Sequence, residues 1–361
     1  MRSNSKVGVG IIGCGIVAYI KHLPALKEIE EAEIVAVFDR NRTKAERVAF
    51  EYGKNAAVYD DLDELLRDTR VDTVYVLTNT GMHSAITVKA LLAGKHVFCE
   101  KPMAISVSEA EKMLEAAEKT GKKLTIGYQN RFLPEVSFLK GLCDEGYFGD
   151  IYHARCLAVR RRAIPVWGSS LSKSANGGGC LIDIGTHAID LALYLMNNYE
   201  VDSVMGNTYQ YLGKQPTKAN ANGLWKAEDF EVEDSAFAFI RMKNGATVSL
   251  DCSWALNTLE VFENKVMLCG SKAGADMFDG VRLNGEVNGN LTITKPDIYG
   301  QTASDIPKPD RYKQKTAESK AWIEAIINDT APLVKAKEAL TVSKVIEAIY
   351  TSARTGNSVK L

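Results

Sequence analysis

The sequence contains no pair of cysteines in a CxxC spacing and no long hydrophobic run. Its seven cysteines are odd in number and dispersed over 361 residues, which argues against a disulfide framework and a thiolate zinc site and fits a reducing cytoplasm. The amino terminus leads directly into an apolar strand pattern, without the roughly 7–15-residue apolar segment of a signal peptide. No run approaches the roughly 18 apolar residues of a membrane helix. We therefore expect a cytoplasmic protein without a membrane partner.

The sequence also lacks an excess of either charge. Lysine and arginine number 44, against 45 aspartates and glutamates, so no net field would attract nucleic acid or anionic lipid. The hydrophobic content of 46% and charged content of 25% are typical of a soluble globular enzyme. Because the chain is too long for one ordinary core, we expect two domains and a small-molecule substrate.

The first 130 residues alternate between strand and helix patterns. Short apolar runs rich in β-branched residues occupy positions 7–12, 33–38, 72–77, 95–100 and 123–128. Helical patterns separate them, and the one at 106–121 has Ser108 as its predicted N-cap and Gly121 as its predicted C-cap. Continuous apolar strands separated by helices indicate a parallel sheet covered on both faces, so residues 1–130 are predicted to form an α/β domain.

Longer strands with partial alternation dominate the remainder of the chain. They occupy positions 151–162, 202–212, 234–242, 246–256 and 262–270. Helices are predicted at about 181–197, 314–328 and 335–355, and long loops at 213–231 and 296–311. Strands in succession favour a mostly antiparallel open sheet. Residues 131–361 are therefore predicted to form an α+β domain.

A glycine fingerprint follows the first strand and opens a helix. It reads Gly13-Cys14-Gly15-Ile16-Val17-Ala18. Gly13 would make the tight turn, Gly15 would let a pyrophosphate approach the backbone, and Ala18 would let the helix pack close to the strand. This pattern predicts a Rossmann dinucleotide-binding domain in which the cofactor contacts Gly13, Gly15, Ile16, Val17 and Ala18.

Asp39 lies 21 residues beyond Ala18, at the end of the second strand. A carboxylate there would hydrogen-bond the adenosine ribose and would repel a 2′-phosphate, which favours NAD. Arg40 follows immediately and could cradle that phosphate. NAD is the predicted cofactor and NADP the alternative.

A second polar cluster lies on the apolar helix at about 181–197. Asp183, His187 and Asp190 have the i, i+4, i+7 spacing of one helical face, and three glycines at 177–179 would let another backbone or a flat ligand come close. His187 could be a buried histidine satisfied by Asp183, or the pair could bind a metal with Cys180, although a lone His/Asp pair is a poor basis for zinc. The third interpretation is an acid–base pair in which Asp183 orients His187.

Together these segments resemble the glucose–fructose oxidoreductase/inositol dehydrogenase (Gfo/Idh/MocA) family. The likeness spans nearly the whole chain. Its motifs are the fingerprint at 13–18, "TNTGMH" (78–83), "EKP" (100–102), "GYQNRF" (127–132), "GDIYHARC" (149–156) and "GGGCLIDIGTHAIDL" (177–191).

The resemblance implies roles for individual residues. Lys101, Asp183 and His187 would fall on the family's catalytic positions and contact the substrate. Cofactor contacts would come from Thr78, Asn79, His83, Glu100, Lys101 and Gln129, with Glu100 near the nicotinamide ribose. The family pattern also implies a cis bond before Pro102 and assembly into a homodimer or homotetramer. No metal is needed, since Lys101 supplies the positive charge.

Further candidates follow from the sequence around these motifs. Tyr128 and Arg131 could line a cleft, although Arg131 could equally be a solvated hinge residue. Arg160 and Arg162 share one face of a strand and could meet a polar substrate or form a solvated edge. Trp167 could stack on a sugar ring.

The leading hypothesis is an NAD-dependent oxidoreductase acting on a ring hydroxyl of a sugar, sugar derivative or cyclic polyol. An NAD-dependent glycosidase that oxidises its substrate only transiently is the first alternative. A non-catalytic dinucleotide-binding sensor is the second, but it would be expected to lose Lys101, Asp183 and His187, and all three are present.

Overall fold

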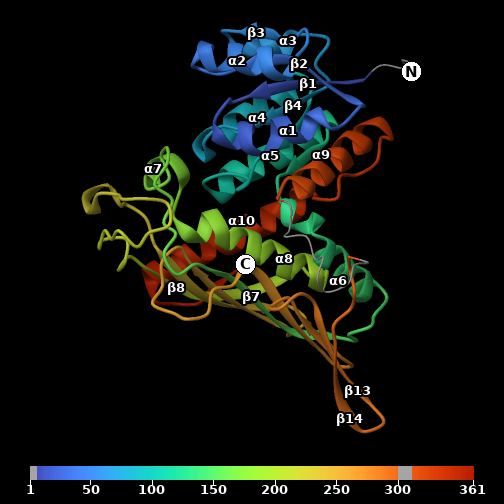
Figure 1. Cartoon of the computed structure of the whole chain (residues 1–361), viewed down its shortest axis with the longest axis vertical. Coiled ribbons are helices and arrows are strands. Elements are labelled where there is room, and N and C mark those ends of the chain that lie inside the picture. Colours follow the sequence, from blue (N-terminus) through green and yellow to red (C-terminus); the bar gives the residue numbers. More distant parts are fainter. Residues whose placement is uncertain (1–5, 300–310) are drawn as a thin grey trace. The chain divides into compact units, whose positions relative to one another are not determined.

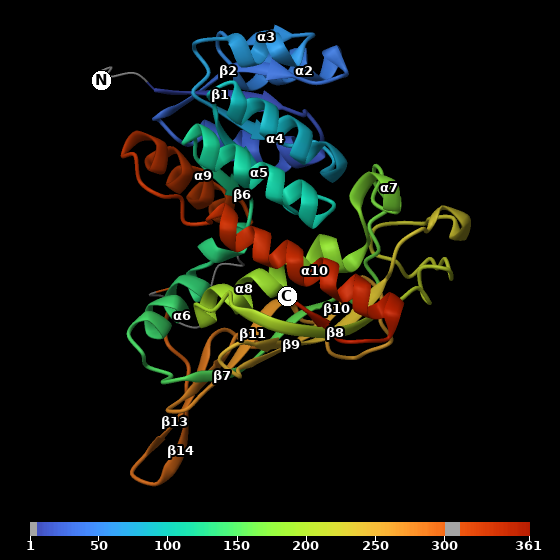
Figure 2. The same ribbon diagram turned by 180° about the vertical axis from the view of Figure 1, so that it is seen from behind.

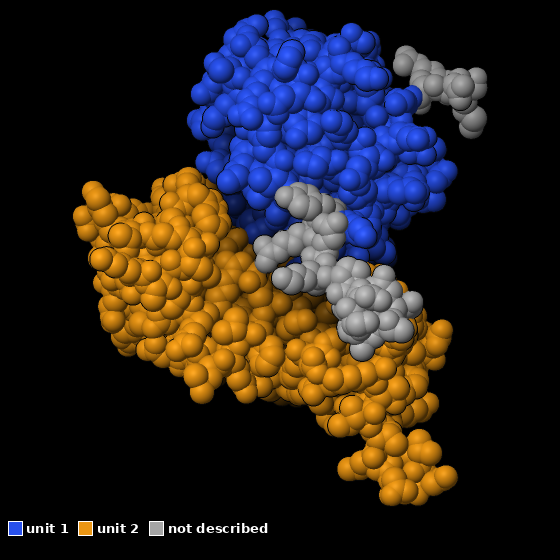
Figure 3. Space-filling model, viewed as in Figure 1, with its two compact units in different colours: residues 1–132, 308–340 blue, residues 133–307, 341–361 orange. Residues whose placement is uncertain are grey.

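The computed structural model describes residues 6–299 and 311–361. The chain divides into two compact units. Unit 1 comprises Met1–Phe132 and Lys308–Leu340, and unit 2 comprises Leu133–Pro307 and Thr341–Leu361 (Figure 3).

Unit 1 is built on a six-stranded sheet in which every pair is parallel. Its order is β3-β2-β1-β4-β5-β6, the order of doubly wound dinucleotide-binding sheets. The strands are β1 Val7–Ile12, β2 Ala32–Phe38, β3 Ala57–Tyr59, β4 Thr73–Val76, β5 His96–Cys99 and β6 Leu124–Ile126. β1 and β4 are buried along their whole length, as expected for a sheet covered on both faces. The three-residue β3 was not anticipated because it is too short for a hydrophobic pattern.

Helices cover the sheet of unit 1 on both faces (Figures 1 and 2). They are η1 Ala18–His22, α1 Leu23–Lys27, α2 Arg42–Tyr52, α3 Leu62–Arg67, η2 Thr80–Met82, α4 His83–Leu92, α5 Val107–Thr120, η3 Gln129–Phe132 and α9 Arg311–Ile327. Ser106, and not Ser108, caps α5, because its hydroxyl accepts the amide of Glu109. Gly121 ends the same helix at φ 65°, as predicted.

α9 belongs to unit 1, although the division at residue 130 grouped it with the second domain. Trp322 and Ile323 lie in the core of unit 1 with Phe98 of β5. The Trp322 indole also donates a hydrogen bond to Thr73 Oγ1 in β4, at 3.2 Å. The amphipathic pattern of this helix predicts that it has an apolar face, but not which of the two sheets covers that face.

Unit 2 is built on a nine-stranded sheet of order β14-β13-β12-β11-β7-β10-β9-β8-β15. All of its pairs are antiparallel except β7 with β10. The strands are β7 Ile151–Val159, β8 Val201–Tyr209, β9 Ser235–Met242, β10 Thr247–Ser253, β11 Glu263–Gly270, β12 Gly274–Asp276, β13 Arg282–Val287, β14 Asn290–Thr294 and β15 Val359–Lys360. This is the predicted mostly antiparallel sheet. The β13–β14 hairpin extends away from the rest of unit 2 (Figure 1).

One face of this sheet is covered by helices, chiefly α8. The remaining helical elements are α6 Pro134–Asp144, α7 Lys173–Asn176, η4 Leu181–Gly185, α8 Thr186–Met196, η5 Ala227–Asp229 and α10 Ala336–Thr355. α10 spans the sequence boundary between the units. The segment Lys173–Met196 is long and apolar enough to cross a membrane, but 83% of its apolar window is buried, as in a core helix. The predicted loop at 213–231 lies between β8 and β9, whereas residues 300–310 of the other loop lie outside the described residues.

Candidate functional site

The glycine turn after β1 packs against the end of β4, where the strand order of the sheet reverses. Gly13 has φ 97°, and a Cβ on it would lie 2.8 Å from the carbonyl oxygen of Leu77. Only glycine combines this left-handed conformation with such a close approach. Ligands of open parallel sheets bind at this kind of switch point.

The residues after the turn fit a dinucleotide. A Cβ added at Gly15 would have no heavy atom within 4 Å among the described residues other than its chain neighbours, so the backbone there has open space beside it. Ile16 is 59% exposed and Val17 is half-buried, whereas Ala18 is fully buried against the sheet. This combination leaves room for a pyrophosphate against the backbone.

Asp39 is fixed beside the glycine turn by backbone hydrogen bonds. One carboxylate oxygen accepts the amide N–H of Cys14 at 2.7 Å, and the other accepts that of Asn41 at 2.8 Å. Each oxygen keeps a lone pair for a ribose hydroxyl. The spacing in the sequence predicted the position of Asp39, while its bond to the fingerprint itself could not be read from the pattern. Arg40 is exposed.

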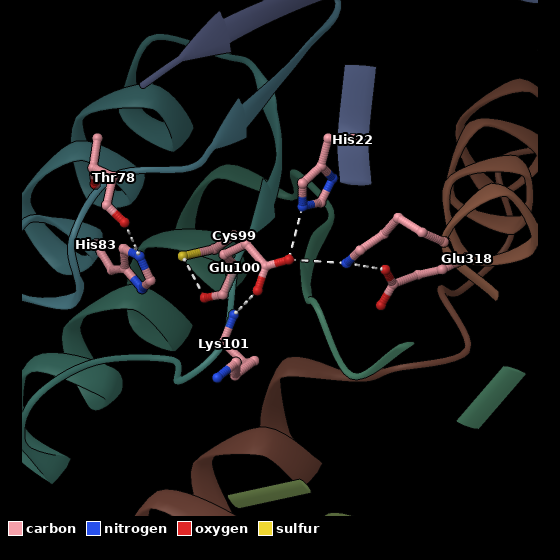
Figure 4. Close-up of polar contacts among 8 residues, drawn as sticks. His22, Thr78, His83, Cys99, Glu100, Lys101 and Glu318 are labelled. Carbon is pink, nitrogen blue, oxygen red and sulfur yellow. Dashed lines mark hydrogen bonds and ion pairs between the residues drawn. The ribbon is translucent and has the colours of Figure 1, made fainter. Parts of the chain in front are cut away.

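Lys101 follows β5 at the carboxyl end of the parallel strands, the same end at which the glycine turn lies. The bond from Lys101 to Pro102 is cis, as the family resemblance implied. The amide N–H of Lys101 donates to Glu100 Oε2 at 3.0 Å, and the Lys101 side chain extends away from that carboxylate (Figure 4). Glu100 is only 5% exposed and also binds His22 and Lys315. Its carboxylate therefore faces the interior of unit 1.

His83 connects the loops that follow β4 and β5. Its Nδ1 lies 2.8 Å from the carbonyl oxygen of Pro102 and its Nε2 lies 3.2 Å from that of Thr78. Burial lowers its pKa, although both carbonyls act against this. His83 is thus engaged inside unit 1, whereas Asn79 is exposed and Thr78 and Gln129 are half-buried.

The Asp183/His187 pair lies at a π-helical turn. Residues Leu181–Gly185 form the π-helix η4, which continues into α8, so the helical spacing assumed from the sequence is locally widened. The Trp254 indole N–H donates to Asp183 Oδ2 at 2.9 Å. His187 is 6% exposed and Asp190 is fully buried. The structure supplies an orienting donor, Trp254, that the sequence did not indicate.

Arg160 is ion-paired at the end of β7. Its Nε donates to Glu263 Oε2 at 2.8 Å. Burial acts to lower the pKa of Arg160, but the carboxylates of Glu263 and Asp183 raise it above its ordinary value. Arg160 is therefore part of the Asp183 environment and is not a solvated edge residue. Trp167 is 49% exposed.

Glu233 holds the start of the η4–α8 helix. Its carboxylate accepts the amides of Gly179 and Leu181, at 2.9 and 3.0 Å, and the hydroxyl of Tyr350 at 2.9 Å. A Cβ on Gly178 would lie 1.9 Å from the Tyr350 hydroxyl oxygen. The glycines before the helix thus admit neighbouring groups of unit 2. No spacing in the sequence pointed to Glu233.

Two further expectations are settled by burial. Tyr128 and Arg131 are each 1% exposed, and Arg131 pairs with Glu338 at 2.6 Å. Arg131 is therefore an interior anchor for the first turn of α10, and not a cleft or solvated hinge residue. Within residues 6–299 and 311–361, no cluster of three or more His, Cys, Asp or Glu side chains could hold a metal ion.

Two family models match most of the chain. The model of the oxidoreductase family with an NAD-binding Rossmann fold (GFO_IDH_MocA) matches residues 7–128, and the GFO/IDH/MocA C-terminal domain matches residues 136–276. The chain belongs to this family. It is an oxidoreductase whose NAD-binding Rossmann domain lies in unit 1, so the predicted family, fold class and cofactor are confirmed.

Individual relatives match over nearly the full length. The chain is 34% identical to the D-glucoside 3-dehydrogenase of Escherichia coli K12 over 360 residues, 99% of each protein. It is 27% identical to the myo-inositol 2-dehydrogenase of Thermotoga maritima over 356 residues, 98% of each. The crystal structure of an aldose-aldose oxidoreductase from Caulobacter crescentus, in complex with glycerol, has a TM-score of 0.78 at 27% identity and covers 99% of this chain and 100% of its own.

Asp39→Asn should weaken the preference for NAD over NADP, because it keeps the side-chain shape and one acceptor oxygen while removing the charge that repels a 2′-phosphate. Asp39→Ala should in addition raise the Kd for NAD by about tenfold, the equivalent of one lost hydrogen bond. Fluorescence titration with both nucleotides measures the change. An unchanged NAD/NADP ratio in both variants would contradict the assignment of Asp39 to the ribose.

Trp254→Phe should lower kcat by about 10- to 100-fold, because a hydrogen bond to a charged group contributes roughly 1.5–3 kcal/mol and Asp183 would lose its indole donor. Trp322→Phe is the matched control, since it removes an indole hydrogen bond to Thr73 in the core of unit 1. It should lower thermal stability and leave kcat unchanged. Equal kcat values in the two variants would show that the Trp254 contact is structural only.

Proposed function

We propose that this protein oxidises a ring hydroxyl of a sugar, sugar derivative or cyclic polyol with NAD, and that D-glucosides are the first substrates to test. The observation that carries the proposal is the position of Lys101. It follows β5 at the carboxyl end of the parallel strands, where the glycine turn fits a dinucleotide, and Glu100 accepts a hydrogen bond from its backbone N–H. Full-length relatives act on a glucoside and on myo-inositol, both of which offer secondary ring alcohols.

The proposed chemistry removes a hydride from the carbinol carbon and a proton from its hydroxyl group. NAD, when bound, accepts the hydride from the carbinol carbon. The Lys101 ammonium donates a hydrogen bond to the substrate oxygen and lowers the pKa of the alcohol. The His187 imidazole takes the hydroxyl proton, and Asp183, held by Trp254, orients the imidazole. The product is a ketone.

The cysteines support a cytoplasmic location. All seven are unpaired as disulfides, and five of them are buried, where the thiols are shielded. A reducing compartment is where such a set persists.

The open face of the sheet in unit 2 supports assembly into a homodimer or homotetramer. Residues paired across adjacent strands form a row on this sheet. Its members, in order, are Met205 of β8, Phe239 of β9, Ser249 of β10, Arg155 of β7 and Met267 of β11. Paired residues share one face of a sheet. Met205 is 55% exposed and Phe239 is 50% exposed, so the part of the row on β8 and β9 presents apolar side chains outward, as interaction surfaces do.

Lys101→Met should leave NAD binding nearly intact and reduce turnover by about 10³-fold or more, because it removes the charge that stabilises the developing alkoxide. The control is Lys112→Met, on the exposed surface of α5, which should behave like wild type. The assay follows absorbance of the reduced nicotinamide with D-glucosides, free sugars and inositols. Wild-type turnover in Lys101→Met would contradict the mechanism, and release of aglycone without net NADH would indicate a glycosidase.

Phe239→Glu should convert the oligomer into monomers in analytical ultracentrifugation, because it places a charge beside Met205 on the exposed apolar part of this row. Phe50→Glu is the matched control, since Phe50 of α2 is 91% exposed in unit 1. It should leave the mass unchanged. A wild-type protein that sediments as a monomer would disprove the assembly.

A further inference from the structure

The Glu100 carboxylate is a buried negative charge that binds groups from three parts of unit 1. Oε1 accepts hydrogen bonds from His22 Nε2 of η1 at 2.7 Å and from Lys315 Nζ of α9 at 2.9 Å. Oε2 accepts the amide N–H of Lys101 at 3.0 Å. Figure 4 shows the carboxylate between His22 and the backbone of Lys101. These three hydrogen bonds hold the side chain inside unit 1.

Lys315 is a buried cation that the proposed reaction does not use. It is 1% exposed, its Nζ also donates to Glu318 Oε2 at 2.6 Å, and it lies 5.4 Å from the centre of the Phe98 ring. Burial acts to lower the pKa of Lys315, but the carboxylates of Glu100 and Glu318 raise it above its ordinary value. The side chain is therefore an ammonium, and Glu100 supplies part of the charge that makes its burial tolerable.

His22 completes the cluster as a neutral donor. Burial and the charge of Lys315 lower its pKa to about 4. Burial alone would raise the pKa of Glu100, but Lys315 and the hydrogen bond from His22 bring it well below its ordinary value. An ionised carboxylate only accepts hydrogen bonds, so the proton of His22 is on Nε2.

The cluster ends at the backbone of Lys101. The backbone N–H of Lys101 donates to Glu100 Oε2. The carbonyl oxygen of Pro102, the next residue, lies 2.8 Å from His83 Nδ1. Both ends of the Lys101–Pro102 segment are thus anchored to buried side chains. Preorganisation of a reactive group depends on such support, because a displacement of about 1 Å can reduce turnover by about 10²-fold.

We propose that Lys315 is a positioning residue for Lys101: by pairing with Glu100 it fixes the carboxylate that holds the Lys101 amide, and so aims the Lys101 side chain. This inference rests on the proposed role of Lys101. It assigns Glu100 a support role in place of the contact with the nicotinamide ribose that the family resemblance implied.

The first test is Lys315→Met, which keeps the length of the side chain and removes its charge. We expect kcat to fall by about 10- to 100-fold, while the Kd for NAD and the KM for the sugar change by less than about threefold. Lys95→Met is the matched control. Lys95 is also a buried lysine, 9% exposed, but it precedes β5, at the opposite end of the strand from Glu100, and donates to the carbonyls of Asp68 and Val71. It should lose thermal stability and keep the kcat of wild type.

A double variant separates an effect through Lys101 from general destabilisation. If Lys315 acts through Lys101, then Lys101→Met/Lys315→Met should be no slower than Lys101→Met alone, because effects of groups that act as a unit are not additive. Additive losses would overturn the proposal, as would a Lys315→Met protein with the kcat of wild type.

Charge-neutral replacement should restore part of the function. In Glu100→Gln/Lys315→Met the glutamine carbonyl can still accept the Lys101 amide, and the charge of Glu100 is removed together with that of Lys315, so that Glu318 is the carboxylate left without this partner. This variant should have a higher kcat and a higher Tm than Lys315→Met. If Lys315→Met does not fold, the comparison of Glu100→Gln/Lys315→Met with wild type and Lys95→Met replaces it, and a kcat equal to wild type would overturn the proposal.

A measurement without cofactor or substrate reports on Lys101 directly. Reductive methylation with ¹³C gives each lysine an NMR signal, and the Lys101 signal is assigned by its loss in Lys101→Arg. We expect its chemical shift to change in Lys315→Met and to stay unchanged in Lys95→Met. An unchanged signal in both would overturn the inference while leaving the proposed function intact. A fully active Lys101→Met would instead overturn the proposed function.

Discussion

The ion pair between Lys315 and Glu100 connects α9 to the carboxyl end of β5, where the candidate site lies. Both groups are buried, and each would be costly to bury without the other. A helix held only by apolar contacts could slide along the sheet with little change in buried area. A charge pair at 2.9 Å has one favourable register, so α9 is fixed relative to β5, and β5 carries Lys101.

This dependence explains which parts of the site could be predicted from the sequence. Gly13, Gly15, Ala18 and Asp39 are separated by short, fixed spacings, because one strand–turn–helix unit and the next strand position them. Their roles follow from local backbone requirements, and they could be predicted. Lys315 lies 215 residues from Glu100 in the chain, and nothing in its local pattern distinguishes a buried cation from a solvated one on a helix.

The same reasoning applies to the π-helical turns. Hydrophobic periodicity predicted the helix that carries Asp183 and His187, but an extra residue in one turn changes that pattern too little to be detected. The turns occur at Ala18–His22 and Leu181–Gly185, each shortly after a glycine-rich segment. π-turns are rare and occur frequently at functional sites. Here one begins at Ala18 of the glycine fingerprint and the other carries Asp183, so the local irregularity coincides with the proposed chemistry.

The two glycine-rich segments have opposite physical meanings, although they look alike in the sequence. Beside Gly15 there is open space at the backbone, which a ligand can fill. Beside Gly178 and Gly179 a Cβ would lie 1.9 Å from the Tyr350 hydroxyl oxygen and 2.1 Å from the carbonyl oxygen of Glu233, so the space is already filled by unit 2 itself. The first segment therefore leaves room for a ligand, and the second gives Glu233 and Tyr350 room to hold the helix that carries Asp183. The sequence left open whether another backbone or a flat ligand lies against residues 177–179. Neighbouring groups of unit 2 fill that space and support the candidate catalytic helix.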